Sequence, residues 1–518
     1  MSKKISGVVV FVGICALSVL LLSCGSCSSR PAGTLYVETQ GLTDQGTPGI
    51  GFNVTSFAID LNNGGLALIS NNSSTCTIAA TQANNAPCGA PLDIFLDPTG
   101  ATAFVLNQGI PCIFNVQLQQ CIPTSEGPAT PPSIVPYTVN SDGSLSAPIG
   151  ENYYTCLSPT LSGPCPPPPP PPAPPTGALY DTAVAMTHDA AGQFLFVIDE
   201  GVYPPPPACP LVAAPATDST DAGNFAGCPS ISVFSVTPGK TTLTLVSQSS
   251  TYQSPLYLSK IPTGLSAITF TQPTLNGQTE EILFATDNYD LCTVSCLPAG
   301  GVAGPSTPND NAVSVYTVSS SGILTEQPNS PYAVPVNNPI SVLAVNTSPV
   351  GQSSIGGVFV YVGNGAGAGA VTPFQLCTVQ DTTCSPGDVA ENLLVPVVCP
   401  PQQTCSVSAG QNPVAMVVDP TNNFLYVASN GGSSAVYGFS IVATAGTLTP
   451  LTPPSQPTGS QPVGLALQPS MGNLGQFLYV SNSNSANITG FGLSTVNGTM
   501  SSPITVDAPP GPTGIAVH

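Results

Sequence analysis

The sequence contains no tryptophan, only two histidines, and five lysines and arginines in 518 residues. Charged residues of either sign make up 6% of the chain. So few cations exclude the basic patch that nucleic acid or anionic lipid requires. A zinc site of mixed ligands needs clustered thiols with histidines nearby, and His188 and His518 are the only histidines, so we do not expect zinc. Long stretches of 3.6-residue apolar periodicity are missing, so we expect almost no helix beyond the N-terminal leader.

Residues 1–23 have the pattern of an export signal. Lys3 and Lys4 precede an apolar run from Val8 to Leu22. The sequence Leu21-Leu22-Ser23-Cys24 resembles the lipobox of bacterial lipoproteins, which implies cleavage before Cys24 and lipidation of its thiol and new amino group. An ordinary signal peptide or a single membrane anchor is the alternative, although the run is short for a membrane span.

The segment after Cys24 is short and nearly uncharged. Residue 25 is Gly and not Asp, so the resemblance implies an anchor in the bacterial outer membrane, facing the periplasm or the cell surface. Residues 24–32 then form a tether. In the mature chain three cations, Arg30, Lys240 and Lys260, face 25 acidic residues, a net charge of −22. We interpret this acidity as a contribution to solubility.

One unit of four short β-branched and aromatic runs organises the remaining sequence. It is clearest between residues 412 and 452, where Pro, Asn and Gly separate the runs. This pattern is typical of a four-stranded antiparallel meander. The unit recurs over seven segments, which we place at about residues 33–71 with 511–518, 91–150, 180–247, 262–334, 339–398, 412–452 and 461–506.

The first unit is split between the two ends of the chain. Residues 33–39 match a second strand, and the missing first strand is supplied by Gly511–His518. A chain that starts within a unit and ends on the missing strand closes a ring, which removes exposed sheet edges. We therefore expect residues 33–518 to form an all-β, seven-bladed β-propeller.

Two phrases recur along the chain, Phe-Leu-Tyr-Val-Ala/Ser-x-Asn and Asp-Pro-Thr-Gly/Asn. They resemble the YVTN-type, lactonase-like seven-bladed propellers, and the resemblance spans roughly residues 33–518. It implies the propeller fold. It implies lactone hydrolysis only as one possibility, since this fold also carries receptors and scaffolds.

Fourteen cysteines fall into seven neighbouring couples. An exported chain can retain disulfides, and local pairing is the economical choice because each couple lies within one expected loop, although sequence alone does not fix the connectivity. Six couples fall in loops on one face of the expected ring. The expected pairs are Cys76 with Cys88, Cys112 with Cys121, Cys156 with Cys165, Cys209 with Cys228, Cys292 with Cys296, Cys377 with Cys384, and Cys399 with Cys405.

Candidate binding residues are few. Aligned first strands share a small residue near the channel mouth, and Asp93 is the exception that could bind a cation or a polar ligand. Lys260 lies close to the same mouth. Two acidic pairs, Asp199 with Glu200 and Asp287 with Asp290, lie on the loop-rich face, although solvated loop carboxylates are the simpler interpretation. Calcium is a possible cofactor, yet these acids lack the spacing of an EF-hand loop.

Other polar residues recur at equivalent sites and are interpreted as structural. The acids Asp97, Asp189 and Asp419 follow first strands, where Asp stabilises a turn. His188 precedes one of these turns and is interpreted as a packed side chain. Four asparagines end second strands in the same way, namely Asn107, Asn288, Asn430 and Asn482.

Two functions remain open. The first is a monomeric, lipid-anchored propeller that binds a protein, glycan or small ligand through its loop-rich face, without nucleic acid. The alternative is a hydrolase similar to 6-phosphogluconolactonase-related propellers. Because the only mature arginine precedes the fold, we do not expect hydrolysis of phosphorylated lactones. We assign no catalytic residue and favour the binding role.

We predict that the seven cysteine couples form seven local disulfides. Each closes a short loop, so each should stabilise the fold by about 1–3 kcal/mol. Peptide mapping without reduction should find these pairs. Cross-links between distant couples, such as Cys76 with Cys165, would contradict the prediction.

Overall fold

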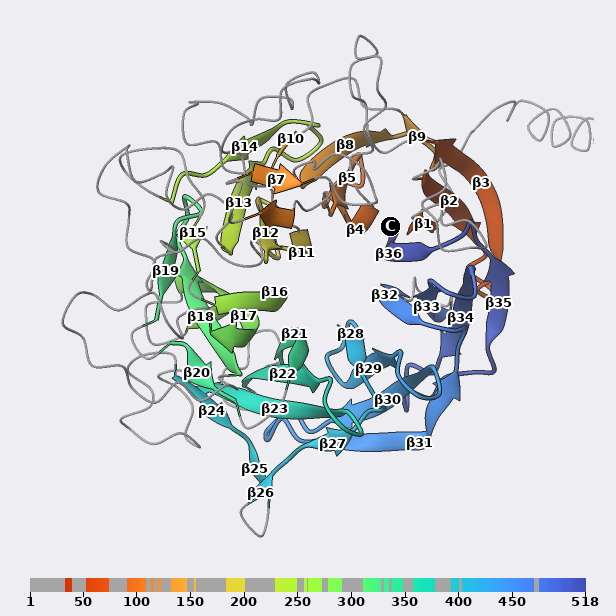
Figure 1. The fold of residues 1–518 in the computed structure, drawn as a ribbon. Helices are drawn as coiled ribbons and strands as arrows, with labels where there is room; N and C mark the ends of the chain where they lie inside the picture. The colour runs from red at the N-terminus through yellow and green to blue at the C-terminus, as the bar shows by residue number, and fades with distance from the viewer. Residues whose placement is uncertain are drawn as a thin grey trace, which may run out of the picture.

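Seven antiparallel sheets form a closed ring around a central axis (Figure 1). The computed structural model describes residues 33–39, 53–73, 91–108, 113–115, 120–122, 132–146, 153–154, 183–200, 229–248, 256–258, 260–272, 278–290, 311–327, 330–334, 338–347, 357–377, 393–399, 403–469 and 475–518. These residues contain no helix, and therefore none that could cross a membrane. The expected all-β, seven-bladed propeller is confirmed.

Each sheet is one blade with its first strand at the axis. From the axis outward, the first blade consists of β36 (Pro512–Val517), β1 (Thr34–Thr39), β2 (Asn53–Ile59) and β3 (Leu66–Ser73). The second blade consists of β4 (Pro91–Leu96), β5 (Thr102–Asn107) and β8 (Ser133–Val139), and both β9 (Leu145–Ser146) and β10 (Tyr153–Tyr154) pair with β8. The third blade consists of β11 (Ala183–His188), β12 (Phe194–Asp199), β13 (Ser230–Val236) and β14 (Leu243–Leu245), and β15 (Leu256–Tyr257) pairs with β13.

The other four blades follow the same order. They consist of β16 (Lys260–Gln272), β17 (Gln278–Asp290), β18 (Ala312–Val318) and β19 (Leu324–Glu326), with β20 (Tyr332–Ala333); β21 (Pro339–Asn346), β22 (Val358–Asn364), β23 (Ala370–Cys377) and β24 (Leu393–Pro396), with β27 (Val407–Ser408); β28 (Pro413–Val418), β29 (Phe424–Ser429), β30 (Ala435–Ile441) and β31 (Leu448–Pro457); and β32 (Pro462–Gln468), β33 (Gln476–Asn482), β34 (Asn487–Leu493) and β35 (Ile504–Asp507).

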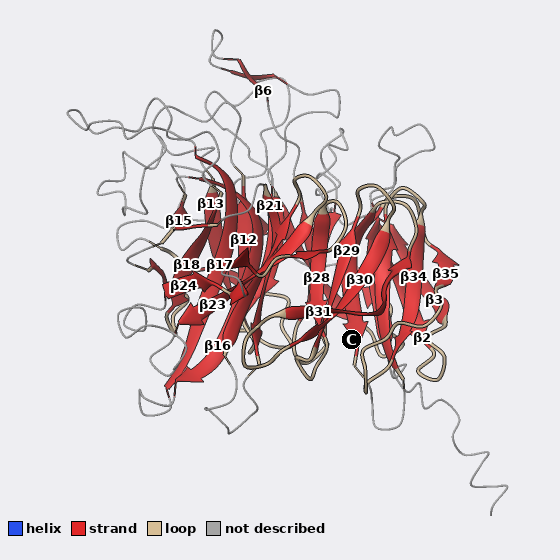
Figure 2. Ribbon diagram, turned by 90° about the horizontal axis from the view of Figure 1, so that it is seen from below, coloured by secondary structure: helices blue, strands red, loops and turns tan. Residues whose placement is uncertain are grey.

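Inner strands start, and second strands end, on one face of the ring, which we call the loop face. The small hairpin of β6 (Ile113–Asn115) and β7 (Gln120–Ile122) belongs to the connection between β5 and β8. Figure 2 shows β6 displaced to one side of the ring, while the C-terminus lies toward the other. A second hairpin, of β25 (Val398–Cys399) and β26 (Gln403–Thr404), extends from the fifth blade.

The ring closes where the C-terminal strand joins the N-terminal blade. β36 pairs antiparallel with β1, with Leu35 opposite Val517 and Val37 opposite Ile515. The backbone N–H groups of Thr34 and His518 each donate to the carbonyl of the other at 2.9 Å. The expected closure is therefore confirmed, and the inner strand of the first blade comes from the last residues of the chain.

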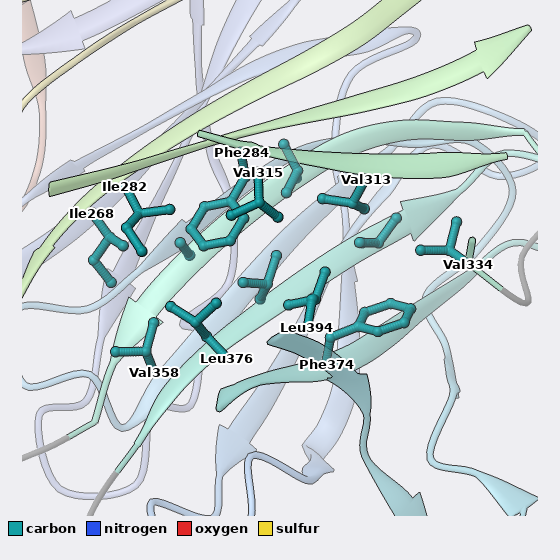
Figure 3. Close-up of a cluster of buried hydrophobic side chains, with 14 of the residues drawn as sticks. Ile268, Ile282, Phe284, Val313, Val315, Val334, Val358, Phe374, Leu376 and Leu394 are labelled. Carbon is teal, nitrogen blue, oxygen red and sulfur yellow. The ribbon is translucent and has the colours of Figure 1, made fainter. Parts of the chain in front are cut away.

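The hydrophobic core is divided among the boundaries between blades. Alternate side chains of a strand point to opposite faces of its sheet. In β1, Leu35 and Val37 therefore pack against the seventh blade, whereas Tyr36 packs against the second. Figure 3 shows the boundary between the fourth and fifth blades, where Phe284 and Phe374 are buried. The described residues form seven such clusters, one for each boundary.

The recurring tyrosine of the second strands joins neighbouring blades. The hydroxyl of Tyr361 donates to the carbonyl of Gly446 at 3.1 Å, Tyr426 donates to Gly498 at 2.7 Å, and Tyr479 donates to Gly64 at 3.0 Å. Each glycine has a positive φ, in a turn between the third and fourth strands of the next blade. The phrase Phe-Leu-Tyr-Val therefore encodes a contact between blades as well as a strand.

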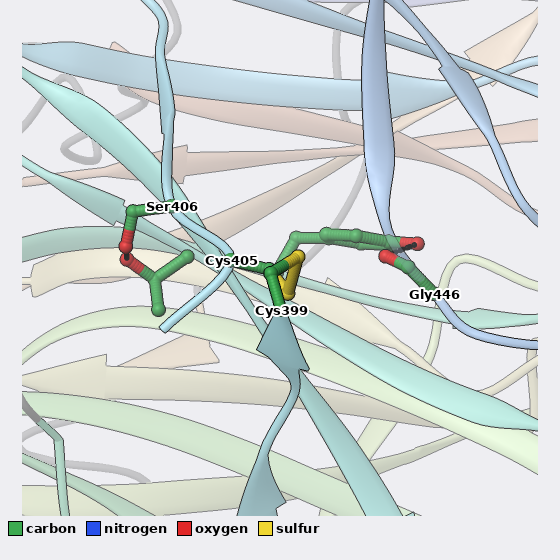
Figure 4. Close-up of a disulfide and its surroundings, with 6 residues drawn as sticks. Cys399, Cys405, Ser406 and Gly446 are labelled. Atoms are coloured by element: carbon green, nitrogen blue, oxygen red, sulfur yellow. Dashed lines mark hydrogen bonds between the residues drawn. A yellow bond between two sulfur atoms is a disulfide. The ribbon is translucent and has the colours of Figure 1, made fainter. Parts of the chain in front are cut away.

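One predicted cysteine couple is confirmed in full. Cys399 and Cys405 form a disulfide that closes the β25–β26 hairpin (Figure 4). Cys377 is also disulfide-bonded, which agrees with its predicted membership of a couple.

The other predicted disulfides cannot be compared with the described part of the chain. The strand β7 includes Cys121, but its side chain is not among those described, and the remaining cysteines lie outside the described residues altogether. Their pairing stays a prediction, as do the lipidation of Cys24 and the assignment of the leader. The cysteines of the predicted couples that lie outside the described residues are Cys76, Cys88, Cys112, Cys156, Cys165, Cys209, Cys228, Cys292, Cys296 and Cys384.

Deleting Gly511–His518 should remove the inner strand of the first blade. The unpaired edge of β1 and the exposed apolar side chains of two blade boundaries should then cause aggregation or a large loss of stability. Size-exclusion chromatography and thermal unfolding of the truncated protein would measure this effect. A monomer with unchanged melting would contradict the closed ring.

Candidate functional site at the closing seam of the ring

The first layer of the candidate site is the residue that follows the β-bulge near the start of each inner strand. Asp93 takes this position in β4 and pairs with Leu106 just after a β-bulge. The same bulge recurs in the other blades, so the register identifies the equivalent residues. They are Ala185, Gly264, Ser341, Ala415, Gly464 and Gly514. The described inner strands therefore carry a single carboxylate, and it lies close to the loop face.

The second layer lies on the neighbouring second strands. Glu38 is the penultimate residue of β1, beside the bulge that opposes Gly514. The equivalent residues are apolar, hydroxyl-bearing or glycine, namely Leu106, Ile198, Thr286, Gly363, Ala428 and Ser481. Glu38 is therefore the one carboxylate in the described part of this layer.

The two carboxyl groups interact across the boundary between the first and second blades. Glu38 is 0% exposed, and neither of its carboxyl oxygens has a hydrogen-bond partner. Burial, and then the charge of Asp93, hold the pKa of Glu38 well above its usual range. Asp93 is only partly buried. Desolvation nevertheless raises its pKa to about 7, although backbone hydrogen bonds from Ile94 and Met186 act in the opposite direction and lower it.

Gly514 of β36 makes room for this pair. A Cβ atom on Gly514 would lie 2.6 Å from Oε2 of Glu38, 2.7 Å from Cα of Asp93 and 3.0 Å from the carbonyl oxygen of Leu92. Both separations from the backbone are shorter than normal contacts. Because its φ is not in the left-handed region, Gly514 is needed here for space and not for conformation.

This arrangement suits proton transfer. A carboxyl with a pKa near 7 is about equally able to accept and to donate a proton in neutral water. Asp93 is the partly exposed member of the pair, whereas Glu38 is enclosed. Two carboxyls whose surroundings separate their proton affinities form a typical acid–base pair.

The pair supplies few ligands for a metal. Calcium takes six to eight oxygen ligands. No group of three or more histidines, cysteines, aspartates and glutamates that could hold a metal occurs within the residues that the structure describes. Glu38 and Asp93 alone do not make a calcium cage, and the expectation of calcium stays a prediction.

Two of the predicted ligand residues have structural partners. Asp199 is buried at the end of β12, and Asp287 is buried within β17, three residues before that strand ends. Asp287 accepts a hydrogen bond from the hydroxyl of Ser314 at 2.7 Å, and Asp199 accepts one from Ser230 at 3.4 Å. Each carboxylate therefore joins the second strand of its blade to the third, and a ligand role for either one stays a prediction.

The other predicted site residues are not brought together with Asp93. Glu200 is exposed directly after β12 in the third blade. Lys260 and Asp290 are backbone partners in the fourth blade, and their side chains lie outside those that the structure describes. Asp93 is in the second blade, so the sequence-based set is spread over three blades.

The recurring turn acids have the structural role that the sequence predicts. Oδ1 of Asp97, Asp189 and Asp419 each accepts a hydrogen bond at 2.7 Å from the backbone N–H five residues later. His188 lies beside the second of these turns. Its ring packs against Phe95 at a centroid distance of 4.2 Å, which agrees with the interpretation as a packed side chain.

The register separates asparagines that look equivalent in the sequence. Asn107 and Asn482 face the first proline of their inner strands, at the end of β5 and β33. Asn288 and Asn430 come one residue later, because Asp287 and Ser429 hold that position. Equivalent residues must therefore be assigned from pairing and not from the phrase alone.

Glu38 was not identified from the sequence. Comparing first strands isolates Asp93, but the second strands carry the matching signal. Aligned with the sequence of the sixth blade, Glu38 takes the place of Ala428, and a charged residue there is unusual in the repeat. Its proximity to Asp93 depends on how the first blade packs against the second, which no local pattern describes.

The chain matches no family model and no curated protein. Among solved structures it resembles the periplasmic gluconolactonase of Pseudomonas aeruginosa, at 17% identity and a TM-score of 0.50, over 93% of this chain and 99% of that one. A putative 6-phosphogluconolactonase of Bacteroides uniformis has 14% identity and a TM-score of 0.49, over 94% of this chain and 100% of that one. At such identities the likeness to the first of these shows a shared propeller fold.

Replacing Gly514 by Ala should disturb the carboxyl pair. Overpacking should cost about 1–3 kcal/mol of stability, and a displaced Asp93 should lose part of its raised pKa. A group whose pKa is raised in the folded state contributes to the unfolding free energy at low pH, and this contribution is lost as the pH rises from the ordinary pKa of the group to its folded pKa. The unfolding free energy of Gly514→Ala should therefore fall less than that of wild type between pH 4 and pH 7.

Gly464→Ala is the matched control for this measurement. Its Cβ would be equally crowded, at 2.9 Å from both Ser481 Oγ and Ile515 Cγ2, but no carboxylate is adjacent. Urea unfolding of both variants at several pH values makes the comparison. A Gly464→Ala variant that flattened the pH dependence as strongly would show that the effect is not specific to the pair.

Proposed function

We propose that this chain is a hydrolase of the lactonase type, with Asp93 as its general base. The observation that carries the proposal is the position of Asp93, the one carboxylate of the described inner strands, partly buried close to the loop face. Desolvation there raises its pKa to about 7, which suits a base in neutral solution. The propeller fold shared with a periplasmic gluconolactonase supports it. That support is an analogy of fold and not of site.

The proposed reaction is general-base hydrolysis of a cyclic ester. The ionised carboxylate of Asp93 removes a proton from a water molecule, whose oxygen forms a bond to the lactone carbonyl carbon. The ring C–O bond then breaks, and the protonated Asp93 returns its proton to the leaving oxygen. The product is an open hydroxy acid, and the carboxylate of Asp93 is regenerated.

The proposed substrate is an uncharged lactone. Lys260 is the one cationic residue of the described inner strands, and it lies in a different blade from Asp93. Asp93 must be ionised to act as a base, so its negative charge would repel an anionic substrate. We propose uncharged sugar lactones and not phosphorylated ones, since phosphoryl groups are normally held by arginine and lysine or by helix N-termini.

A binding role is the second candidate. The topology supports it, because the connections between second and third strands, such as that from Asp199 to Ser230, all leave from the loop face. Six of the seven cysteine couples belong to connections of this face, so its loops are long and cross-linked by our assignment. We also propose export and lipid anchoring at Cys24, with the propeller outside the cytoplasm.

The hydrolase is tested by activity against uncharged aldonolactones. The rate of the purified mature protein, corrected for spontaneous hydrolysis, should rise as pH increases through about 7, because the base must be deprotonated. Asp93→Asn should lower kcat/KM by about 100-fold or more. A phosphorylated lactone should be a poor substrate, with kcat/KM below about 10⁴ M⁻¹s⁻¹.

Asp507→Asn serves as the control. It makes the same chemical change at an exposed residue of an outer strand and should leave the rate unchanged. Full activity of Asp93→Asn, or no turnover of any lactone above the spontaneous rate, would exclude Asp93 as a lactonase base. A ligand found by thermal-shift screening, without turnover, would favour the binding role.

A further inference from the structure

We propose that Glu38 is a neutral carboxylic acid that donates a hydrogen bond across the blade boundary to the carbonyl of Leu92, and thereby positions Asp93. The role toward Asp93 rests on the proposed function, because it makes Glu38 a positioning residue for that base. The hydrogen bond itself does not rest on it and can be measured without any substrate.

The first argument is the burial of Glu38. Both carboxyl oxygens are enclosed and without a hydrogen-bond partner, and the side chain is 0% exposed. An isolated buried carboxylate is costly, and such a group normally takes up a proton. No surface of Glu38 is open to solvent, so a hydrated cation has no access. A proton neutralises the group without requiring space.

The second argument comes from the repeat itself. Ser481 holds the position of Glu38 in the seventh blade, and its hydroxyl donates to the carbonyl of Thr513 at 2.6 Å. Thr513 is the second residue of the next inner strand, β36. Leu92 is the second residue of the inner strand that follows Glu38, β4. Glu38 and Leu92 are therefore the equivalents of Ser481 and Thr513 at the neighbouring boundary.

The distances around the two glycines support this equivalence. A Cβ on Gly464 would lie 2.9 Å from Ser481 Oγ and 3.0 Å from the Thr513 carbonyl oxygen, and these two atoms are hydrogen-bonded to each other. A Cβ on Gly514 would lie 2.6 Å from Glu38 Oε2 and 3.0 Å from the Leu92 carbonyl oxygen. The two oxygens therefore lie beside the same point, and because a carboxylate and a carbonyl are both acceptors, a hydrogen bond between them requires that Glu38 carries the proton.

The groups around Glu38 agree with a neutral acid. Asp93 on β4 and Tyr137 on β8 interact electrostatically with it, and neither is a cation. Strands β2, β5 and β36 have no titratable side chain in their sequences. Nothing on these elements would stabilise a charged Glu38.

The hydrogen bond would connect two parts of the chain and lie beside a third. Glu38 belongs to the N-terminal strand, Leu92 and Asp93 to the second blade, and Gly514 to the C-terminal strand. Because Leu92 precedes Asp93, a bond to the Leu92 carbonyl fixes the backbone from which the Asp93 side chain extends. The proposed base is then positioned by the contact between the first and second blades.

Proton release on unfolding tests the bond. Near pH 6 an unfolded glutamate is ionised. If Glu38 is protonated in the folded protein, wild type should therefore release about one more proton on unfolding than Glu38→Gln does. The pH slope of the unfolding free energy measures this difference. The unfolding free energy of wild type should fall as the pH rises, because the pKa of Glu38 is raised in the folded state. The stabilisation that protonated Glu38 contributes is complete below the ordinary pKa of glutamate and is lost as the pH rises toward the folded pKa. At pH 8 the infrared spectrum of wild type should contain a protonated-carboxyl C=O band that Glu38→Gln lacks.

Two further variants complete the design. Glu38→Gln keeps a donor for the Leu92 carbonyl and should fold, whereas Glu38→Ala loses the donor and should melt at a lower temperature. Ser481→Ala removes the equivalent hydrogen bond in the seventh blade, whose donor is a hydroxyl group that does not titrate. This variant should therefore be less stable than wild type but keep the same pH slope of the unfolding free energy. Equal pH slopes and infrared spectra for wild type and Glu38→Gln would overturn the proposal, as would Ca²⁺ binding to wild type that Glu38→Gln abolishes.

These outcomes are separate from those of the hydrolase. If wild type turns over no lactone but shows the extra proton and the infrared band, the hydrogen bond stands and the catalytic role fails. If lactones are hydrolysed through Asp93 and the band is absent, the base stands and the proton on Glu38 is refuted. With both present, Glu38→Ala should shift the pH–rate profile, whereas Ser481→Ala should not.

Discussion

The pairing of β36 with β1 is the constraint on which the rest of the structure depends. Each blade buries its apolar side chains only against its two neighbours, so the core is a ring of seven boundaries and has no independent centre. A break at the closing pair would expose two boundaries and an unpaired edge together. The last six residues with strand structure therefore stabilise a chain of 518 residues.

Polar contacts repeat around the same ring and fix how neighbouring blades pack. Tyrosine hydroxyls of the second strands donate to glycine carbonyls in the turns of the next blade, as Tyr426 does to Gly498. Near the loop face, hydroxyls of the inner layers donate to carbonyls of the next inner strand, as Thr263 does to Pro339 at 2.7 Å and Ser341 to Pro413 at 2.5 Å. Each bond satisfies a backbone carbonyl that packing would otherwise bury unpaired.

The candidate site is a local variation of this repeated scheme. Where other blades have small, apolar or hydroxyl side chains, the first boundary has Glu38 and Asp93, with Gly514 leaving room beside them. A position that normally serves packing thus carries ionisable chemistry, and its burial raises both pKa values. The site is therefore part of the packing of the ring, and its chemistry is sensitive to how well the ring closes.

Much of the fold, and half of the site, could be predicted from the sequence. Strand patterns, turn glycines and aspartates are local, so the seven units and the role of Asp97, Asp189 and Asp419 follow from short segments. Asp93 is detectable because it interrupts a row of small residues in aligned first strands. Asp199 and Asp287 resemble loop acids in the sequence, but the structure places them in second strands, where they are bonded to serines of the third strands.

The sequence by itself determined the repeat, its number and the exchange of strands between the two ends of the chain, because these depend on residue spacing within each unit. The tertiary structure alone decided which side chains meet across a boundary. Glu38, Asp93 and Gly514 are far apart in the chain and come together only when the ring closes. Burial, and with it the ionisation of both carboxyls, is a property of that closed boundary and not of any segment within it.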